Sequence, residues 1–375
     1  MFSKEKIYNN IFNILFVILM FAYFLFNYVN IDLNTVTRMK VNMLILLGFL
    51  SIFIFRLSIF KRISKINLLS ISILSLFIIF KAIFKDNLPV EYSVLIFILS
   101  IGLLNENNIH FIRYLIISKV IFLFFIMLLS QLGYINQSEF IKQDYSIALS
   151  YGFIHSNTLG IIGLSIILDL SLLYRYNRAP KHIILLSIIF ICYMYFISKA
   201  RTSLLLEIGL IIAMILNMRL IKIRCSGVLL VTISLLIILM GIILPYYFDS
   251  NSELWNKLNI LFNQRLFLGN LYIDNYGITF FPKAIPQLFL QREYDVIMYY
   301  NDNTFLALLL SSGLFLFSAI LCFIFYQQLN GQYSLYYVFI LSLTLISMIF
   351  ESSGYNVFLF TSLFFRYFAI NGKRS

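Results

Sequence analysis

Four short polar clusters interrupt an otherwise apolar chain, and they contain the residue types best suited to chemistry. They are His155-Ser156-Asn157, Lys199-Ala200-Arg201-Thr202, Gln264-Arg265 and Asp302-Asn303. Arginine carries a planar set of donors that stays protonated and can bind two phosphate oxygens at once. A histidine or an aspartate beside such arginines could take a proton from a hydroxyl group. These residue types together suit a phosphorylated substrate, and the arginines could stabilise a departing diphosphate.

Each of the four clusters also has a purely structural interpretation. Arg201 could extend its charged end to lipid headgroups, and Arg265 could lie on the polar face of a surface helix. His155 could bond a backbone carbonyl at the start of a helix. Asp302 could cap the helix that follows it. Taken one at a time, the clusters do not decide between chemistry and architecture.

The composition predicts which kind of element must position these clusters. Of the 375 residues, 61% are hydrophobic and only 12% are charged, whereas soluble domains are about 45–50% apolar and about 25% charged. Apolar runs of about 20 residues, long enough for a helix to cross ~30 Å of hydrocarbon, recur along the whole chain. A β-barrel would instead alternate polar and apolar residues over strands of about 10 residues. The sequence therefore predicts an all-α, polytopic integral membrane protein, with one transmembrane domain over residues 1–375.

Short polar breaks divide the chain into twelve predicted membrane-spanning helices. The predicted spans are 11–31, 41–60, 66–84, 92–104, 112–132, 158–176, 182–198, 200–218, 226–247, 303–325, 334–350 and 354–370. All five prolines fall in the breaks or at helix ends, as expected for uninterrupted helices. An even number of spans puts both termini on the same side of the membrane.

The charged residues of the connections predict the orientation of the chain. Lys and Arg gather in one set of connections, around residues 56–65, 175–181 and 219–224, while nearly all acids fall in the other set. Because basic residues of short loops are retained in the cytoplasm, the basic side and both termini should be cytoplasmic. The net charge of +12 is thus explained by topology, and nucleic acid is not an expected partner.

The largest external connection, residues 248–302, is longer than a link between two helices requires. Long loops of this kind tend to carry function. Apolar residues from Leu254 to Leu266 recur at helical spacing within it and predict a helix on the outer leaflet. The single tryptophan, Trp255, would anchor this helix at the level of the headgroups. The sequence shows no internal repeat and no matching pair of interrupted helices, the pattern typical of many secondary transporters.

Four charged residues inside the spans should form ion pairs, because an unpaired charge at the bilayer centre costs about 2.5–3.5 kcal/mol. Lys119 and Asp169 lie at equal depth, and Lys81 and Glu207 both lie in the outer half of their spans. We interpret both as structural pairs, with a proton relay as the alternative. The three cysteines show neither a disulfide framework nor zinc-binding spacing, and we predict neither a metal nor a cofactor.

Residues 150–360 resemble the superfamily of Wzy-type polysaccharide polymerases and O-antigen ligases, bacterial enzymes that act on undecaprenyl-diphosphate-linked glycans. The block from Gly152 to Gly160 is similar to the family pattern Gly-x-x-His-Pro-Asn-x-x-Gly, with Ser156 in place of proline. The segment Ser198-Lys199-Ala200-Arg201-Thr202-Ser203 is similar to the family's Ser-Arg-Thr element.

Two further blocks carry the same resemblance. Gln264-Arg265, followed by Tyr276-Gly277-Ile278, resembles the Gly-Arg and Tyr-Gly-Ile elements of the large outer loop in capsule polymerases. Asp302-Asn303, then nine residues, then Gly313 reproduces the spacing of the ligase motif His-Asn-x9-Gly. Aspartate stands where that motif has histidine, which resembles polymerase members more than ligases.

The resemblance implies a fold related to the membrane glycosyltransferases of the C superfamily, and a reaction outside the bacterial cytoplasmic membrane that uses no nucleotide sugar and no essential metal. The glycan on one undecaprenyl diphosphate would be transferred to the nonreducing sugar of a second lipid-linked unit. The implied roles are diphosphate binding by Arg201 and Arg265, proton acceptance by His155 or Asp302, and support by Asn157, Thr202 and Asn303. Membrane lipid, a flippase and a chain-length regulator would be further partners.

Three other functions remain open at this stage. A ligase would attach finished glycan to a different acceptor, so its loss would leave long polymer on the lipid carrier. A flippase or exporter would need alternating access around charges at mid-membrane. A noncatalytic scaffold would tolerate point changes at all four clusters.

Overall fold

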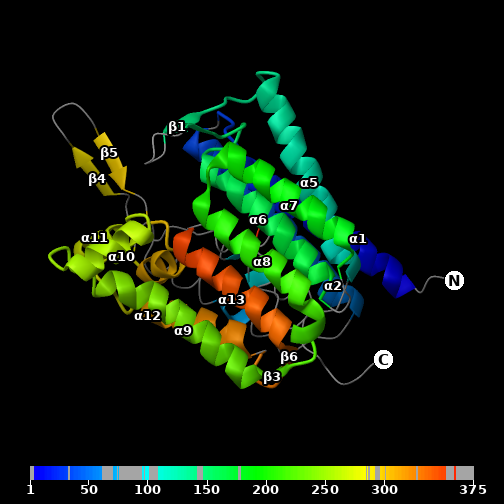
Figure 1. The fold of residues 1–375 in the computed structure, drawn as a ribbon. Helices are drawn as coiled ribbons and strands as arrows, with labels where there is room; N and C mark the ends of the chain where they lie inside the picture. Colours follow the sequence, from blue (N-terminus) through cyan, green and yellow to red (C-terminus); the bar gives the residue numbers. More distant parts are fainter. Residues whose placement is uncertain are drawn as a thin grey trace.

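The chain is mostly helical in the computed structural model (Figure 1). The structure describes residues 4–359 apart from residues 33, 61–70, 74, 76–94, 97, 101–108, 142–146, 176–178, 284, 286–287, 292–295, 300, 327 and 352–358.

Within these ranges, eight helices are long and apolar enough to cross a membrane. They are α1 (Lys4–Tyr28), α2 (Thr35–Phe60), α5 (Ile109–Gln131), α6 (Ser156–Leu173), α7 (Lys181–Ser198), α8 (Arg201–Leu220), α9 (Gly227–Tyr246) and α12 (Thr304–Tyr326). A shorter apolar helix, α13 (Leu335–Phe350), packs among them. The prediction of a polytopic membrane protein is confirmed.

These nine helices correspond to nine of the predicted spans. The predicted spans 66–84, 92–104 and 354–370 lie largely outside the described residues. The total of twelve therefore stays a prediction.

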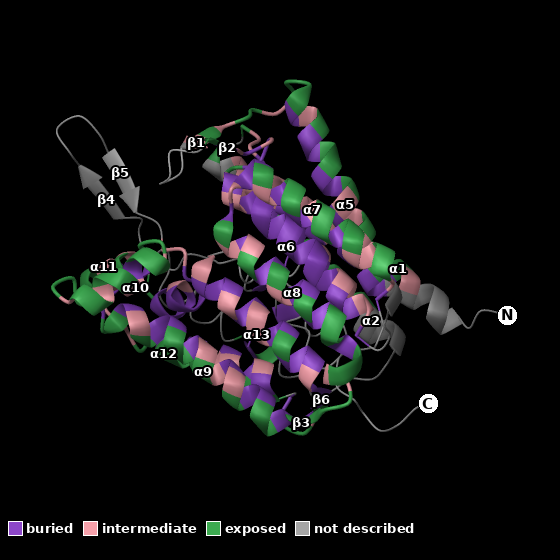
Figure 2. Ribbon diagram, viewed as in Figure 1, coloured by how far each residue is buried: buried purple, intermediate pink, exposed green. Residues whose placement is uncertain are grey.

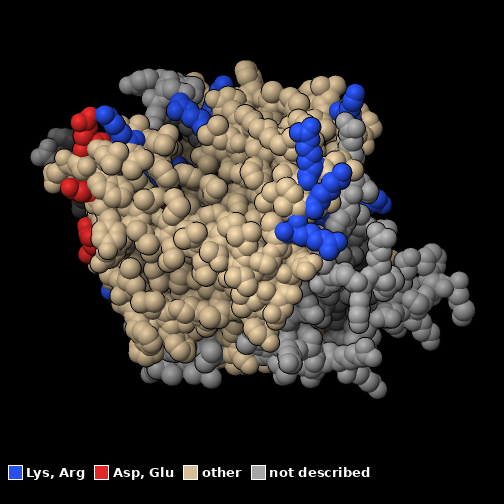
Figure 3. Space-filling model, turned by 60° about the horizontal axis from the view of Figure 1, so that its bottom comes forward, with Lys and Arg blue, Asp and Glu red and all other residues tan. Residues whose placement is uncertain are grey.

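The helices run between two ends of different character. At the left of Figure 1 lie α10 (Glu253–Leu261) and α11 (Arg265–Tyr276), with the hairpin of β4 (Leu288–Gln291) and β5 (Val296–Tyr299) above them. Strands β3 (Arg224–Ser226) and β6 (Gln332–Ser334) pair antiparallel at the opposite end. Figure 3 shows Asp and Glu gathered at the left of the molecule and a group of Lys and Arg at the right. Lys and Arg also lie near the acids at the upper left, so in this view only the acids are confined to one side.

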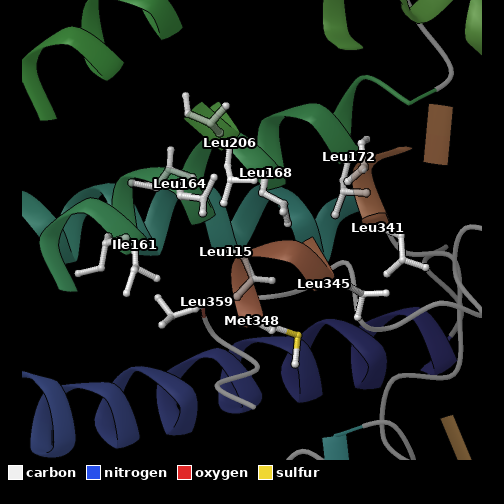
Figure 4. Packing of buried hydrophobic residues seen from close by; sticks show 14 of the residues in the cluster. Leu115, Ile161, Leu164, Leu168, Leu172, Leu206, Leu341, Leu345, Met348 and Leu359 are labelled. Carbon is white, nitrogen blue, oxygen red and sulfur yellow. The ribbon is translucent and has the colours of Figure 1, made fainter. Parts of the chain in front are cut away.

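Helix α6 is the centre of the bundle, and 83% of its residues are buried (Figure 2). It has no polar face, and a helix that is apolar all round is stable only when other helices surround it. Figure 4 shows Leu164 and Leu168 of α6 among Leu115 of α5, Leu206 of α8 and Leu345 of α13. The core therefore extends along the length of α6.

Small residues let α6 approach its neighbours closely. A Cβ atom added to Gly160 would lie 2.5 Å from the Cβ of Ala200, and one added to Gly163 would lie 3.1 Å from Oε1 of Glu207. Glycine at a helix interface allows this close approach of backbones. The contact fixes the start of α6 beside the turn between α7 and α8.

The predicted ion pair inside the bundle is confirmed for Lys119 and Asp169. Nζ of Lys119 lies 2.6 Å from Oδ2 of Asp169, and both side chains are fully buried. Glu207 is also buried, but its predicted partner Lys81 lies outside the described residues, so that pairing stays a prediction.

The predicted interfacial helix from Leu254 to Leu266 is wrong in its extent. The backbone turns into the left-handed region at Asn263 and Gln264, which separates α10 from α11. Leu266 is therefore buried in α11, whereas Leu254 on α10 stays exposed. Trp255 packs against Phe248 with ring centroids 6.3 Å apart, and its anchoring role stays a prediction.

The prediction of an uninterrupted helix over 303–325 is also wrong. Gly313 has φ 70° and ψ 167°, which breaks α12 into two halves. The segment 277–283 fills the break, where the amides of Leu314 and Phe315 donate to the carbonyls of Thr279 and Phe280 at 2.9 and 3.1 Å. Non-helical backbone at membrane depth requires such internal partners. The outer loop is thereby attached to the middle of α12.

Candidate functional site

Three charged residues from different elements meet at the α10–α11 end of the bundle. Nη2 of Arg265, the first residue of α11, lies 3.7 Å from Oδ2 of Asp302 and 3.7 Å from Oε1 of Glu351. Asp302 precedes α12, and Glu351 follows α13. The site, which we call the Arg265 cluster, consists of these three residues.

Asn303, and not Asp302, accepts hydrogen bonds from the first amides of α12, so the Asp302 carboxylate can face Arg265. The amides of Phe305 and Leu306 donate to Oδ1 of Asn303 at 3.0 and 3.1 Å, so Asn303 caps the helix. Its Nδ2 donates to the carbonyl of Gly241 on α9 at 2.5 Å. The interpretation of Asp302 as the cap is therefore wrong, because Asn303 takes that role. The predicted supporting residue Asn303 holds α12 against α9 and thereby fixes Asp302.

The guanidinium of Arg265 is buried, and one of its donors, Nε, has no hydrogen-bond acceptor among the described residues. Arg265 is only 6% exposed, and its Nε has no hydrogen-bond partner among the residues that the structure describes. Both carboxylates lie beyond the 2.7–3.2 Å of a normal N–H···O bond, and the ring of Phe350 lies 5.7 Å from Cζ. Burying a charge without hydrogen bonds is costly. The cluster therefore has a buried donor, Nε of Arg265, for which the described protein atoms supply no acceptor.

The surroundings of Asp302 change the pKa of its carboxyl group. Burial raises the pKa of its carboxyl group, and the neighbouring charge of Arg265 lowers the pKa by less, so the pKa stays above its ordinary value. A carboxylate whose pKa is raised toward neutrality is a better general base.

A polar network between α10 and α11 positions Arg265. Nδ2 of Asn259 donates to Oε1 of Gln264 at 2.6 Å, and its Oδ1 accepts from the amide of Phe267 at 3.0 Å. Gln264 has φ 66°, a conformation that glycine adopts without strain.

His155 lies at the start of α6, as the structural interpretation expected, but with a different partner. The amide of Asn157 donates to Nδ1 of His155 at 3.0 Å, so the imidazole caps α6 through this nitrogen. A neutral imidazole that accepts at Nδ1 carries its proton on Nε2. The ring of Phe140 lies 4.3 Å from the imidazole. In this tautomer His155 can donate a hydrogen bond from Nε2 but cannot take a proton there.

Arg201 and Thr202 open α8 beside the start of α6. Arg201 is exposed and Thr202 is half-buried, and Lys199 takes a left-handed conformation with φ 52° at the preceding turn. Because Ala200 touches Gly160, the His155 and Arg201 clusters are neighbours. The structure thus brings two of the four predicted clusters together here.

The contact of α8 with α13 relates Arg201 to the Arg265 cluster. Strand β3 follows α8, β6 precedes α13, and the two strands pair, so α8 and α13 run antiparallel. A Cβ atom on Gly209 would lie 3.1 Å from Leu343. Arg201 is eight residues before Gly209, and Glu351 is eight residues after Leu343, so both lie about 12 Å along their helices from this contact. Arg201 is therefore level with Glu351.

Glu351 is the member of the site that the motifs did not reveal. It is 15% exposed at its side chain, and its carbonyl accepts a hydrogen bond from the hydroxyl of Thr304. The only sequence signal was its position directly after a predicted span, on the acidic side of the membrane. No motif of the resembled family includes this residue.

No protein-family model, curated protein or solved structure matches the chain. In the described ranges, no group of three or more His, Cys, Asp or Glu residues is arranged to hold a metal ion.

Proposed function

We propose that the chain is a membrane glycosyltransferase that joins undecaprenyl-diphosphate-linked oligosaccharide repeat units into a capsular or exopolysaccharide. The reaction takes place at the outer face of the bacterial cytoplasmic membrane, with both termini in the cytoplasm. The fold we propose is related to the C superfamily of membrane glycosyltransferases. Order and spacing of the four polar clusters, described above, support this proposal.

The observation that carries the proposal is the buried guanidinium of Arg265. Its Nε has no acceptor among the described residues, and it lies at the end of a membrane bundle rich in apolar surface. A diphosphate offers several charged oxygens that match the donor geometry of arginine. A lipid carrier would hold that diphosphate at the level of Arg265 and Arg201. The site therefore suits a phosphate group delivered by a lipid.

We assign the role of proton acceptor to Asp302, because its carboxylate lies beside Arg265. The acceptor sugar loses a hydroxyl proton to the Asp302 carboxylate, and its oxygen forms a bond to the anomeric carbon of the donor glycan. The bond between that carbon and the diphosphate oxygen breaks, and the electron pair stays on the diphosphate. Arg265 stabilises the negative charge that develops there. His155 acts as a donor from Nε2, not as the base.

The test is a size profile of lipid-linked glycans from cells that carry Arg265→Gln. Because diphosphate binding is lost, we expect single lipid-linked units to accumulate and long polymer to disappear. Arg219→Gln is the matched control, since Arg219 is an exposed arginine at the other end of α8. Polymer of unchanged length in the Arg265 variant would refute the proposal. Long polymer that stays on the lipid carrier would instead identify a ligase.

A flippase is the second candidate, and the interruption of α12 at Gly313 favours it. Broken helices near the bilayer centre mark the binding sites of many transporters. In the described ranges, the break is filled by the segment 277–283, whose backbone bonds would have to open for substrate to enter. A flippase would leave single units on the cytoplasmic leaflet when the gene is lost, and leaflet-specific labelling of the units separates the two functions.

A further inference from the structure

The Arg265 cluster contains one more carboxylate than diphosphate binding and proton transfer require. Asp302 and Glu351 both lie 3.7 Å from the same nitrogen of Arg265, so their oxygens are no more than twice that distance apart. With both carboxylates ionised the cluster has one net negative charge. Such an excess opposes the negative charge that develops on a departing diphosphate unless one carboxylate is neutralised.

The backbone of Glu351 is held in place by two helices. Thr304, at the start of α12, donates its hydroxyl hydrogen to the Glu351 carbonyl. Phe350, the last residue of α13, packs its ring against Phe262 at 5.2 Å and beneath the Arg265 guanidinium at 5.7 Å. The carboxylate therefore approaches Arg265 from a fixed position.

The two carboxylates differ in exposure, and this difference suggests different roles. Asp302 is 35% exposed at its side chain, whereas Glu351 is 15% exposed. An acceptor hydroxyl can therefore reach Asp302 more readily than Glu351. The less accessible carboxylate is the better fixed partner for Arg265.

We propose, on the basis of the proposed function, that Glu351 is a positioning residue that keeps Arg265 oriented and charge-paired while Asp302 takes the acceptor proton. When Asp302 is protonated, its attraction for Arg265 is lost, and the Arg265–Glu351 pair remains. The cluster then becomes neutral and accepts the negative charge of the departing diphosphate. The proton later passes from Asp302 to water, which restores the starting state.

In the described part of the chain, the residue that forms an ion pair with Asp302 is Arg265. Arg265 faces it from α11 and Glu351 from α13, while α9 carries no charged residue at all. The other ion pair of the outer loop, Lys257 with Glu253, is turned to solvent, with side chains 72% and 84% exposed. The pH response of Asp302 should therefore depend mainly on Arg265 and Glu351.

The test is polymer formation in proteoliposomes that contain the full-length protein, supplied with lipid-linked repeat units extracted from cells lacking the gene. In Glu351→Gln we expect turnover to fall by about tenfold to a hundredfold with little change in KM, because Arg265 is misoriented. The acidic limb of the pH–rate profile should move to lower pH, because removal of a neighbouring negative charge eases ionisation of Asp302. Glu351→Asp should restore part of the activity. Glu253→Gln, an exposed acid on α10, is the matched control and should behave as the parent protein.

A double variant separates positioning from a general loss of structure. If Glu351 acts through the proton transfer at Asp302, Glu351→Gln combined with Asp302→Asn should be no slower than Asp302→Asn alone. Elution of each variant as the parent species in detergent shows that it is folded. Parental turnover and pH profile in Glu351→Gln, with Asp302→Asn strongly slowed, would overturn the role of Glu351 and leave the proposed function standing. Failure of the parent protein itself to make polymer would overturn both.

Discussion

Replacing Lys119 by methionine removes one half of a fully buried ion pair and leaves the Asp169 carboxylate without its partner. The two side chains meet at 2.6 Å with no exposure to solvent, so water cannot compensate the remaining charge. Breaking a buried pair in this way costs about 3–5 kcal/mol, and Asp169→Leu should cost a similar amount. The double variant removes both charges, and replacing a buried pair by apolar residues is often neutral or stabilising. We therefore expect the double variant to be more stable than either single variant.

The free energy of unfolding can be measured for the four proteins by titrating SDS into mixed micelles. We expect the double variant to lose much less free energy of unfolding than the sum of the two single variants, with a coupling energy of at least about 3 kcal/mol between the two positions. Two single variants that each lose less than about 1 kcal/mol, and whose effects add in the double variant, would refute it. That result would mean that the pair is solvated or does not form in the membrane.

Three further changes test other parts of the structure. Gly313→Ala should lower the free energy of unfolding by about 1–3 kcal/mol or more, because Gly313 has a positive φ and an added Cβ would lie 2.5 Å from the Phe281 carbonyl. The control Gly133→Ala should lose less, because Gly133 also has a positive φ but an added Cβ would meet no atom within 4 Å. Asn259→Ala should cost about 1–3 kcal/mol in the same titration, because it removes two bonds between α10 and α11, and an unchanged midpoint would contradict this. Asp302→Asn should raise the melting temperature at mildly alkaline pH but not at acidic pH. Burial raises the pKa of the Asp302 carboxyl group, so the stability of the folded protein that is present below the unfolded pKa is lost as pH rises through the folded pKa. Asparagine, like the protonated carboxyl group, carries no charge and avoids this loss.

Most of the helical frame could be predicted from the sequence, because apolar runs of membrane-spanning length have few alternatives to a helix. The pairing of Lys119 with Asp169 could also be predicted, because isolated charges at equal depth in a bilayer have few possible partners. The break in α12 could not be predicted. A single Gly313 in an apolar run is compatible with a straight helix, and its conformation depends on the segment 277–283, more than thirty residues earlier in the chain.

The composition of the site was only partly predictable for a similar reason. Arg265 and Asp302 belong to motifs, and the structure brings them together. The resemblance implies a supporting role for Asn303 and proton acceptance by His155 or Asp302, whereas the hydrogen bonds described above for Asn303 and His155 are those of helix caps. Glu351 was not singled out because its importance comes from the packing of α13 beside α12, which no local pattern reveals.

Direct binding of undecaprenyl diphosphate tests the central claim, that the buried Arg265 guanidinium exists to bind a diphosphate carried by lipid. The purified protein in nanodiscs should gain thermal stability as this lipid is added, because a ligand that binds only the folded state stabilises it. Arg265→Gln should abolish the gain, whereas the control Arg219→Gln should retain it. An equal gain in the Arg265 variant and the parent protein, or no gain in the parent, would contradict the account.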